Sequence, residues 1–261
     1  MAEHKITTDR RSILHLSDLA EITPSKDAVS ANRIVGFNSR DSRARPFSLL
    51  RTSLIKKLKE NNHRLVGITS ASPAAGKSFL AMNLASSLAR VSEEPVFLVD
   101  LDLRRASLSE YLGTAPEVGV ESFIEQKTDR LGDVGYSISG TNLGLFPCVQ
   151  RDQDTAELLA GTGFSRMIEQ FRNESEASII LFDLPPVFAN DDAMIILEQL
   201  DSYIMVADAG KTTRKQVEEV VAMLQPTPCI GSILNRYKGG FGDSYGYGYG
   251  GADYSRYYEQ T

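Results

Sequence analysis

The sequence predicts an α/β protein with a doubly wound, mostly parallel sheet. Two observations support this expectation. Short apolar segments rich in β-branched residues recur along the chain, and such segments suit strands that are covered on both faces. Stretches with helical periodicity separate them, and regular alternation of strand and helix favours a parallel sheet. The 261 residues are enough for one large domain of this kind or two small ones.

The expected elements follow one another in order after residue 45. The first is a helix at 46–60, where Phe47, Leu50, Leu54 and Leu58 form an apolar stripe. Strands are expected at 64–69, 95–100, 177–183, 201–208 and 229–235, with a further candidate at 143–148. Helices between them are expected at 77–91, 163–174, 191–200 and 213–224.

Residues 1–40 lack sustained periodicity and are expected to form a basic, partly flexible arm. Within it, 10–22 could form one short amphipathic helix, and 23–32 are typical of a linker. Residues 1–63 carry a net charge of +5, which leaves −11 for the remainder of a chain whose total is −6. The arm is therefore either a solvated linker or a docking segment. The expected division is an arm at 1–40, a globular domain at 41–236 and a tail at 237–261.

The composition excludes several classes of protein. A net charge of −6 argues against nucleic acid as the main ligand. Cys148 and Cys229 are too few for a disulfide framework or a cysteine-based zinc site, and they fit a reducing cytosol. No apolar run approaches the roughly 18 residues of a membrane span. The polar start shows no signal peptide, so a cytoplasmic location is expected.

A phosphate-binding loop is expected after the first strand of the globular domain. Gly76-Lys77-Ser78 ends the segment "GITSASPAAGKS". In such a loop the amides wrap phosphates, the lysine reaches the β and γ oxygens, and the serine hydroxyl binds Mg²⁺. The helix that follows adds a favourable field for an anion. Ala71 stands where a glycine is usual, so the prediction rests on the strand–loop–helix context as well as on the motif.

Acidic residues end two further strands of the predicted sheet. Asp183 is expected at the carboxyl edge, where open α/β sheets bind ligands and where a P-loop needs a carboxylate for Mg²⁺. Its structural alternative is a turn aspartate. Asp100 and Asp102 alternate in an extended segment, so both carboxylates project to one side. Two like charges there need a cation, which is either Mg²⁺ or one of Arg104 and Arg105.

In this order, Lys77-Ser78, Asp100-x-Asp102-x-Arg104 and Asp183 resemble the Walker A, Walker A′ and Walker B segments of the bacterial tyrosine kinases of exopolysaccharide and capsule export, the BY-kinases. The likeness runs from about Ile34 to the end of the chain. "RPFSLLRTSL" is similar to the arginine-bearing helix of the family, "TAELLAG" also fits, and "IILFDLPPVFANDDA" contains its later aspartate, Asp192. "GSILNR" is similar to its last strand, and the tail is similar to its autophosphorylated tyrosine cluster.

The resemblance implies ATP and Mg²⁺ as cofactors and transfer of a phosphoryl group to tyrosine. Catalytic roles fall to Lys77, Asp100 and Asp102, with Asp100 orienting and deprotonating the acceptor hydroxyl. Arg104 either supports the site or is a plain ion-pair partner. The implied Mg²⁺ ligands are Ser78, Asp102 and Asp183, and the implied nucleotide contacts are Ala74, Ala75, Gly76, Lys77, Ser78, Phe79 and Asn235, the last of which reads adenine. The implied phosphoacceptors are Tyr245, Tyr247, Tyr249, Tyr254, Tyr257 and Tyr258.

The resemblance also implies partners. A membrane-spanning polysaccharide co-polymerase would activate the chain and recruit it to the inner face of the plasma membrane, and a cognate tyrosine phosphatase would reverse the modification. A homo-oligomer is possible with an altered assembly motif, because Arg45 and Ser48 stand where the family has Glu and Arg, and only Arg51 matches. The loop reads Pro-Ala-Ala-Gly-Lys at 73–77 in place of the usual Pro-Gly-Glu-Gly-Lys, and Leu184 replaces the usual threonine after Asp183.

Two other functions stay open at this point. One is a P-loop ATPase of the partitioning type, although Ser72 and Pro73 stand where such proteins carry an additional lysine. The other is a nucleotide-binding, non-catalytic adaptor of a polysaccharide export system, which the altered loop favours. In both of these alternatives the tyrosine-rich tail is a low-complexity end that associates non-specifically, whereas in a kinase it is the substrate.

Overall fold

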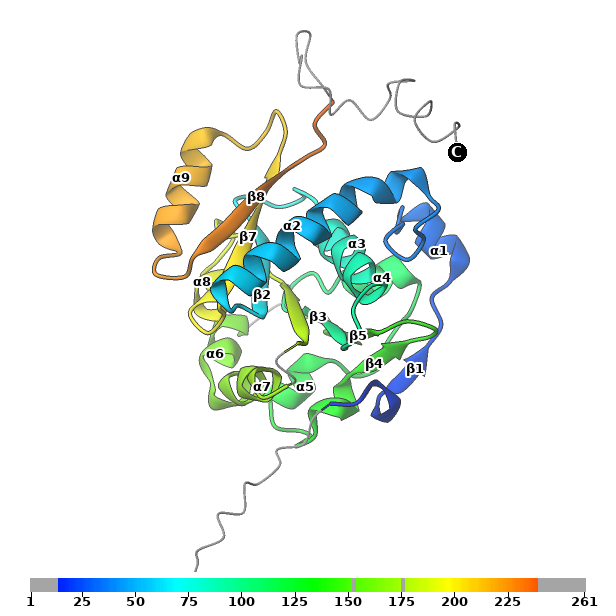
Figure 1. Cartoon of the computed structure of the whole chain (residues 1–261). Coiled ribbons are helices and arrows are strands. Elements are labelled where there is room, and N and C mark those ends of the chain that lie inside the picture. Colours follow the sequence, from blue (N-terminus) through cyan, green and yellow to red (C-terminus); the bar gives the residue numbers. More distant parts are fainter. Residues whose placement is uncertain (1–13, 152–153, 175–176, 239–261) are drawn as a thin grey trace, which may run out of the picture.

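An eight-stranded sheet forms the centre of the computed structural model, which describes residues 14–151, 154–174 and 177–238 (Figure 1). The order of the strands is β1-β4-β5-β3-β6-β2-β7-β8. All neighbours pair in parallel except β4 and β5, which are antiparallel. The strands are β1 (Ala20–Ile22), β2 (Leu65–Ser70), β3 (Val96–Asp100), β4 (Tyr136–Ile138), β5 (Leu143–Phe146), β6 (Ile179–Asp183), β7 (Ser202–Asp208) and β8 (Cys229–Asn235).

Helices cover both faces of the sheet, as expected of a doubly wound fold. In Figure 1, α2 lies across one face, and α5, α6 and α7 group on the other side. The helices are α1 (Lys26–Ala31), α2 (Arg45–Asn61), α3 (Lys77–Ala89), α4 (Leu108–Leu112), α5 (Val120–Ile124), α6 (Thr155–Ala160), α7 (Thr162–Arg172), α8 (Asp192–Leu197) and α9 (Arg214–Met223). Short 3-10 helices occupy η1 (Leu16–Asp18), η2 (Ser42–Ala44) and η3 (Leu131–Val134).

The central strands are buried on both faces, and successive side chains enter opposite halves of the core. Val66, Leu98 and Leu181 join one apolar cluster, which α2, α3 and α4 cover. Phe97 and Phe182 join the other cluster, which α5, α7 and α8 cover. Because β2, β3, β6 and β7 run parallel to one another, their carboxyl ends meet at one edge of the sheet.

The predicted fold class and the main elements are confirmed. Five predicted strands correspond to β2, β3, β6, β7 and β8, the further candidate to β5, and the predicted helices to α2, α3, α7, α8 and α9. The strands β1 and β4 were not predicted. They have three residues each, too few to show a period, and their pairing with each other and with β5 decides their conformation.

Two predictions for the N-terminal region are wrong in the part that the structure describes. In place of a helix at 10–22, the chain forms η1 and then β1, because Leu14 and Leu16 pack on the core beside an extended Ala20–Ile22. In place of a linker at 23–32, it forms α1, whose first turn is capped by the Ser25 side chain accepting from the Ala28 amide. Leu19, Ile34 and Val35, from the expected arm, are buried in the core.

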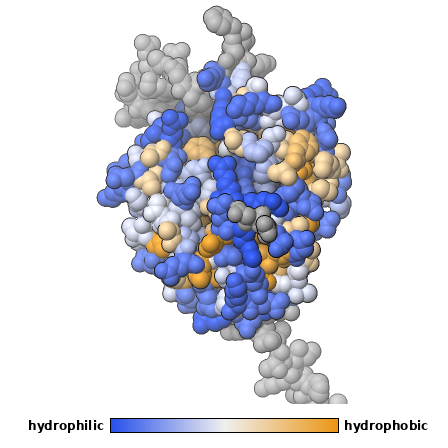
Figure 2. Space-filling view, turned by 180° about the vertical axis from the view of Figure 1, so that it is seen from behind, coloured by the Kyte–Doolittle hydropathy of each residue, from blue (hydrophilic) through white to orange (hydrophobic). Residues whose placement is uncertain are grey.

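The surface is mostly hydrophilic on the side turned away from the view in Figure 1. There, apolar residues lie in small separate patches among polar ones (Figure 2). No helix within the described residues is long and apolar enough to cross a membrane.

Candidate nucleotide site

The phosphate-binding loop connects β2 to α3, where the sequence predicted it. Gly76, at the start of α3, has φ of +94°, a conformation that favours glycine. A Cβ at this position would also collide with Nδ2 of Asn235. Ala74 has φ of +60° and so keeps a left-handed backbone without being glycine, which costs an L side chain roughly 1 kcal/mol or more. The loop therefore holds its shape against the local preference of Ala74.

Three aspartates and one lysine meet beside this loop. Because β3 and β6 are adjacent, Asp100 and Asp183 are register partners at their carboxyl ends. Lys77 donates from Nζ to Oδ2 of Asp102 at 3.1 Å, and both side chains are buried. The structure thus brings together Lys77, Ser78, Asp100, Asp102 and Asp183, as predicted, and all five are at most 5% exposed.

Asp100 is held by the backbone that follows its own strand. Its two carboxylate oxygens accept the amides of Asp102 and Leu108, each at 3.1 Å. Burial and then the nearby charge of Asp183 raise the pKa of Asp100 well above its ordinary value. Its orientation is fixed, and at equal pH it holds a proton more readily than an exposed aspartate.

Asp183 differs because both of its oxygens are buried without a hydrogen-bond partner among the described residues. Burial raises the pKa of Asp183 to about 6, although the charge of Lys77 and then the neighbouring Ser78 hydroxyl oppose the shift; that hydroxyl makes no well-formed hydrogen bond to either oxygen. A buried, unpartnered carboxylate is costly unless it binds a cation. Asp183 and the Ser78 hydroxyl therefore fit a magnesium site, and Asp102 lies close by.

The carboxylate and hydroxyl oxygens of this site also agree with the way in which proteins coordinate Mg²⁺. No group of three or more His, Cys, Asp or Glu side chains placed to hold a metal occurs among the described residues. Mg²⁺ does not need such a group, because it keeps several waters and takes one or two carboxylates together with the phosphates of a nucleotide.

The two arginines after Asp102 do not neutralise the acidic pair. Arg104 donates from Nε to Oγ1 of Thr155 at 3.2 Å and lies 3.7 Å from Oδ2 of Asp192. Arg105 is exposed. Lys77 of the loop itself provides the cation for Asp102. Of the two cations left open for Asp100 and Asp102, an arginine at 104 or 105 forms no ion pair with either aspartate among the described residues, and Arg104 is instead the ion-pair partner of Asp192.

The remaining predicted contacts lie around the loop. Asn235, at the end of β8, donates from Nδ2 to the carbonyl of Ala75 at 2.8 Å. Phe79 packs its ring against Phe47 with centroids 5.8 Å apart and is partly buried. The predicted phosphoacceptors, which are Tyr245, Tyr247, Tyr249, Tyr254, Tyr257 and Tyr258, lie outside the described residues.

The sequence analysis missed two residues of this region, Arg236 and Asp208. Arg236 donates from Nη1 to the carbonyl of Ala74 and to Oδ2 of Asp208, both at 2.7 Å. Asp208 ends β7 and is 5% exposed. Its position at the end of a buried strand was a usable signal, the same one that indicated Asp100 and Asp183.

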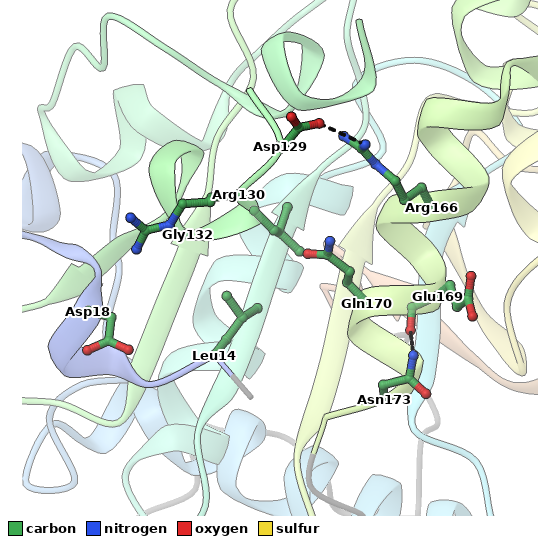
Figure 3. Close-up of a pocket in the computed structure, with 10 residues that line it drawn as sticks. Leu14, Asp18, Asp129, Arg130, Gly132, Arg166, Glu169, Gln170 and Asn173 are labelled. Carbon is green, nitrogen blue, oxygen red and sulfur yellow. Dashed lines mark hydrogen bonds and ion pairs between the residues drawn. The ribbon is translucent and has the colours of Figure 1, made fainter. Parts of the chain in front are cut away.

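A separate cavity of about 460 Å³ lies away from this site, between η3, α7 and the start of the described chain (Figure 3). None of its lining residues belongs to the phosphate loop or to the acidic segments. Its two arginines are already paired, Arg166 with Asp129 at 3.0 Å and Arg130 with Asp133 at 3.8 Å. It therefore offers no cluster of available cations for the phosphates of a nucleotide.

Comparison with known proteins gives a consistent result. Residues 61–236 match the ParA family model, described as the NUBPL iron-transfer P-loop NTPase. The chain is 30% identical over 193 residues to the tyrosine-protein kinase CpsD of Streptococcus agalactiae serotype III, a match that covers 73% of this chain and 81% of CpsD. It is 29% identical over 203 residues to the tyrosine-protein kinase Etk of Escherichia coli K12, covering 76% of this chain.

A solved structure extends the match to three dimensions. The kinase domain of VpsO superposes with a TM-score of 0.67 at 29% identity, covering 75% of this chain and 96% of that domain. The chain spans only 27% of the length of its relatives EpsB and Etk. The P-loop fold, the acidic strand ends and these matches together show that the chain belongs to the P-loop NTPases and, among them, to the bacterial tyrosine kinases.

Proposed function

We propose that the chain is an ATP-dependent protein-tyrosine kinase that phosphorylates its own tyrosine-rich tail and thereby regulates the polymerisation and export of an exopolysaccharide or capsule. The observation that carries the proposal is the buried cluster beside the phosphate loop. There, the paired Lys77 and Asp102 lie beside Asp183, whose two oxygens have no partner among the described residues.

Each residue of the cluster has a distinct role in this proposal. The amides of 74–79 and the ammonium of Lys77 bind the phosphates. Ser78 and Asp183, with Asp102, would hold Mg²⁺, which neutralises charge on the β and γ oxygens when bound. Asn235 reads adenine: with its bonds to Ala75 and to the Arg236 amide made, one N–H and one oxygen lone pair remain for the base.

Asp100 is the proposed proton acceptor for the tyrosine hydroxyl. The phenol has an ordinary pKa of about 10, so a fixed carboxylate of raised pKa assists its attack. Each oxygen of Asp100 accepts one backbone amide and keeps a further lone pair. In the transfer, the tyrosine oxygen bonds to the γ-phosphorus, ADP leaves, and the hydroxyl proton passes to Asp100.

Partners and location are proposed from the resemblance to the family. A membrane-spanning co-polymerase would recruit and activate the chain at the inner face of the plasma membrane, and a tyrosine phosphatase would reset it. Self-assembly through α2 would be altered, because two of its side chains already bond within the chain. Arg51 donates to both the carbonyl and the hydroxyl of Ser87, and the Ser48 hydroxyl accepts from Arg90 at 3.3 Å.

Incubation with labelled ATP and Mg²⁺, followed by detection of phosphotyrosine and of free phosphate, tests the proposal. A kinase labels its own tail. A partitioning-type ATPase would release phosphate without labelling tyrosine, and a non-catalytic adaptor would bind nucleotide and do neither. Adding the cytosolic segment of a polysaccharide co-polymerase to the same assay should raise the rate of labelling. No labelling in the presence of such a segment would contradict the proposal.

A further inference from the structure

A bridge from the end of β8 reaches Ala74, the non-glycine residue of the phosphate loop that has a left-handed backbone. Nη1 of Arg236 donates at 2.7 Å to the carbonyl of Ala74 and at 2.7 Å to Oδ2 of Asp208. A nitrogen of this kind carries two hydrogens, so it serves both acceptors at once. Ala74 and Arg236 both have left-handed backbones, with φ of +60° and +59°. Two non-glycine residues in this conformation, bonded to each other at a candidate site, call for a functional explanation.

The acceptor side of the bridge is anchored in the sheet. Asp208 is 5% exposed and pairs in register with Asn235 at the ends of β7 and β8. Its amide donates to Oγ1 of Thr212 at 2.9 Å, and its carboxylate also lies 3.4 Å from Nζ of Lys211. Arg236 is therefore held against the loop by a carboxylate that belongs to the sheet.

The bridge acts together with Asn235 on two consecutive peptide groups. The carbonyl of Ala74 is bound by Arg236, and the carbonyl of Ala75 is bound by Asn235. In a planar trans peptide, the C=O and the following N–H point in opposite directions. Fixing these two carbonyls outward therefore turns the amides of Ala75 and Gly76 toward the interior of the loop, where a phosphate would lie.

We propose that Arg236 is a positioning residue for nucleotide binding: with Asp208, it holds the left-handed Ala74 so that the loop amides face the phosphates. This inference rests on the proposed function only in taking the loop to bind a nucleotide. The bridge from Arg236 stabilises the left-handed backbone at position 74, which alanine adopts less readily than glycine. A glycine would adopt the same backbone with less help.

The test measures Mg-ADP affinity by titration calorimetry on the full chain, with thermal unfolding as a check of the fold. The Arg236 side chain is 49% exposed, but it bonds at 2.7 Å to a buried carboxylate, so Arg236→Ala should weaken binding by about tenfold, the effect expected from losing one charge-assisted hydrogen bond. Arg214→Ala is the matched control: it removes an exposed arginine whose ion pair with Glu218 lies on α9, and it should leave affinity unchanged.

The double variant Ala74→Gly/Arg236→Ala separates positioning from simple loss of positive charge. Glycine restores no charge, but it relieves the strain, so affinity should return to within about threefold of the wild type. Without nucleotide, the loop amides of Arg236→Ala should exchange hydrogen faster than those of the wild type and of the double variant. Equal losses of affinity in the single and double variants, or unchanged affinity in Arg236→Ala, would overturn the inference. A wild-type chain that binds no nucleotide would instead overturn the proposed function.

Discussion

Two aspartates flank opposite ends of β2, and they differ in what surrounds their carboxylates. Asp201 lies at the amino end of the strand. Its Oδ2 accepts the amides of Arg64 and Leu65 at 2.8 and 2.9 Å, and its Oδ1 accepts Nη1 of Arg172 at 2.7 Å. Asp183, beside the carboxyl end of β2, has no such partner for either oxygen among the described residues.

The pKa shifts of the two groups express this difference. Burial acts to raise the pKa of both. For Asp201, the hydrogen bonds from Leu65, Arg64 and Arg172 outweigh burial and bring the pKa below its ordinary value. For Asp183, burial outweighs the charge of Lys77 and the neighbouring Ser78 hydroxyl, and the pKa rises to about 6. One end of the sheet thus satisfies its carboxylate for stability, and the other leaves a carboxylate open for a ligand.

Lys77→Met should have the largest effect at the carboxyl end. Loss of this cation from the phosphates should lower autophosphorylation by about 10²–10³-fold, as for other preorganised donors. The substitution also leaves Asp102 buried without its partner, which destabilises the fold by roughly 3 kcal/mol. Lys77→Met/Asp102→Asn removes that charge and serves as the stability control. Normal labelling by either variant, with the fold verified by circular dichroism, would disprove the role of Lys77.

Matched substitutions at the two aspartates should change stability in opposite directions. The pKa of Asp183 is 3.8 in ordinary surroundings and about 6 in the folded chain. Between these two pH values, the folded chain therefore keeps a proton on Asp183 that the unfolded chain releases. Stability therefore falls as the pH rises from about 4 to about 6. Asp183→Asn should raise the free energy of unfolding by up to about 3 kcal/mol above pH 6 and by little near pH 4.

Asp201→Asn should instead lower the free energy of unfolding by about 2 kcal/mol, because the new amide group must face one of the donors that the carboxylate accepted. Urea unfolding across pH 4–8, without nucleotide, measures both variants. Saturating Mg-ADP should remove the advantage of Asp183→Asn, since the wild type alone gains the metal contact. The same sign at both positions would refute the contrast between the two ends.

Removal of residues 241–261 tests whether the tyrosine-rich tail, which follows β8 in the sequence, is the substrate. The site residues within the described chain end at Arg236, so nucleotide affinity should be unchanged, whereas most self-labelling should be lost because the six predicted acceptor tyrosines are removed. In the intact chain, mass spectrometry should place phosphate on the six tail tyrosines. Tyr203 is fully buried and Tyr111 half-buried. Phosphate on Tyr203 or Tyr111, with an unmodified tail, would show that the tail is not the substrate and is only a low-complexity end.

The sequence predicts the carboxyl edge better than it predicts the sheet margins. Asp100 and Asp183 end strongly apolar strands, and Lys77 and Ser78 begin the helix after the loop that follows another such strand, so the local pattern predicts where they lie. The short strand Ala20–Ile22 has no such pattern, because its pairing with β4 determines it.

Contacts between side chains that are distant in sequence were not predictable in the same way. The sequence left open which cation lies beside Asp100 and Asp102; Arg104 contacts Thr155 and Asp192 instead, and Lys77 pairs with Asp102. The bridge from Arg236 to Ala74 spans 162 residues and depends on the register between β7 and β8. Motif spacing shows which groups gather at an edge, whereas packing decides which of them bond to each other.

Arg104→Ala should give the smallest effect at the carboxyl end. Its side chain is 48% exposed, and its distance of 3.7 Å to Asp192 is long, so the ion pair should contribute under 1 kcal/mol. Asp192 keeps its bonds from Thr155 at 2.9 Å and Asn190 at 2.7 Å without it. The free energy of unfolding should therefore fall by less than about 1 kcal/mol, and the Mg-ADP affinity should stay within about threefold of the wild type. Arg104→Lys keeps the charge without the Nε bond and should behave alike. A tenfold loss of self-labelling in Arg104→Ala, with unchanged stability and affinity, would show instead that Arg104 contacts the acceptor tyrosine or the transferred group.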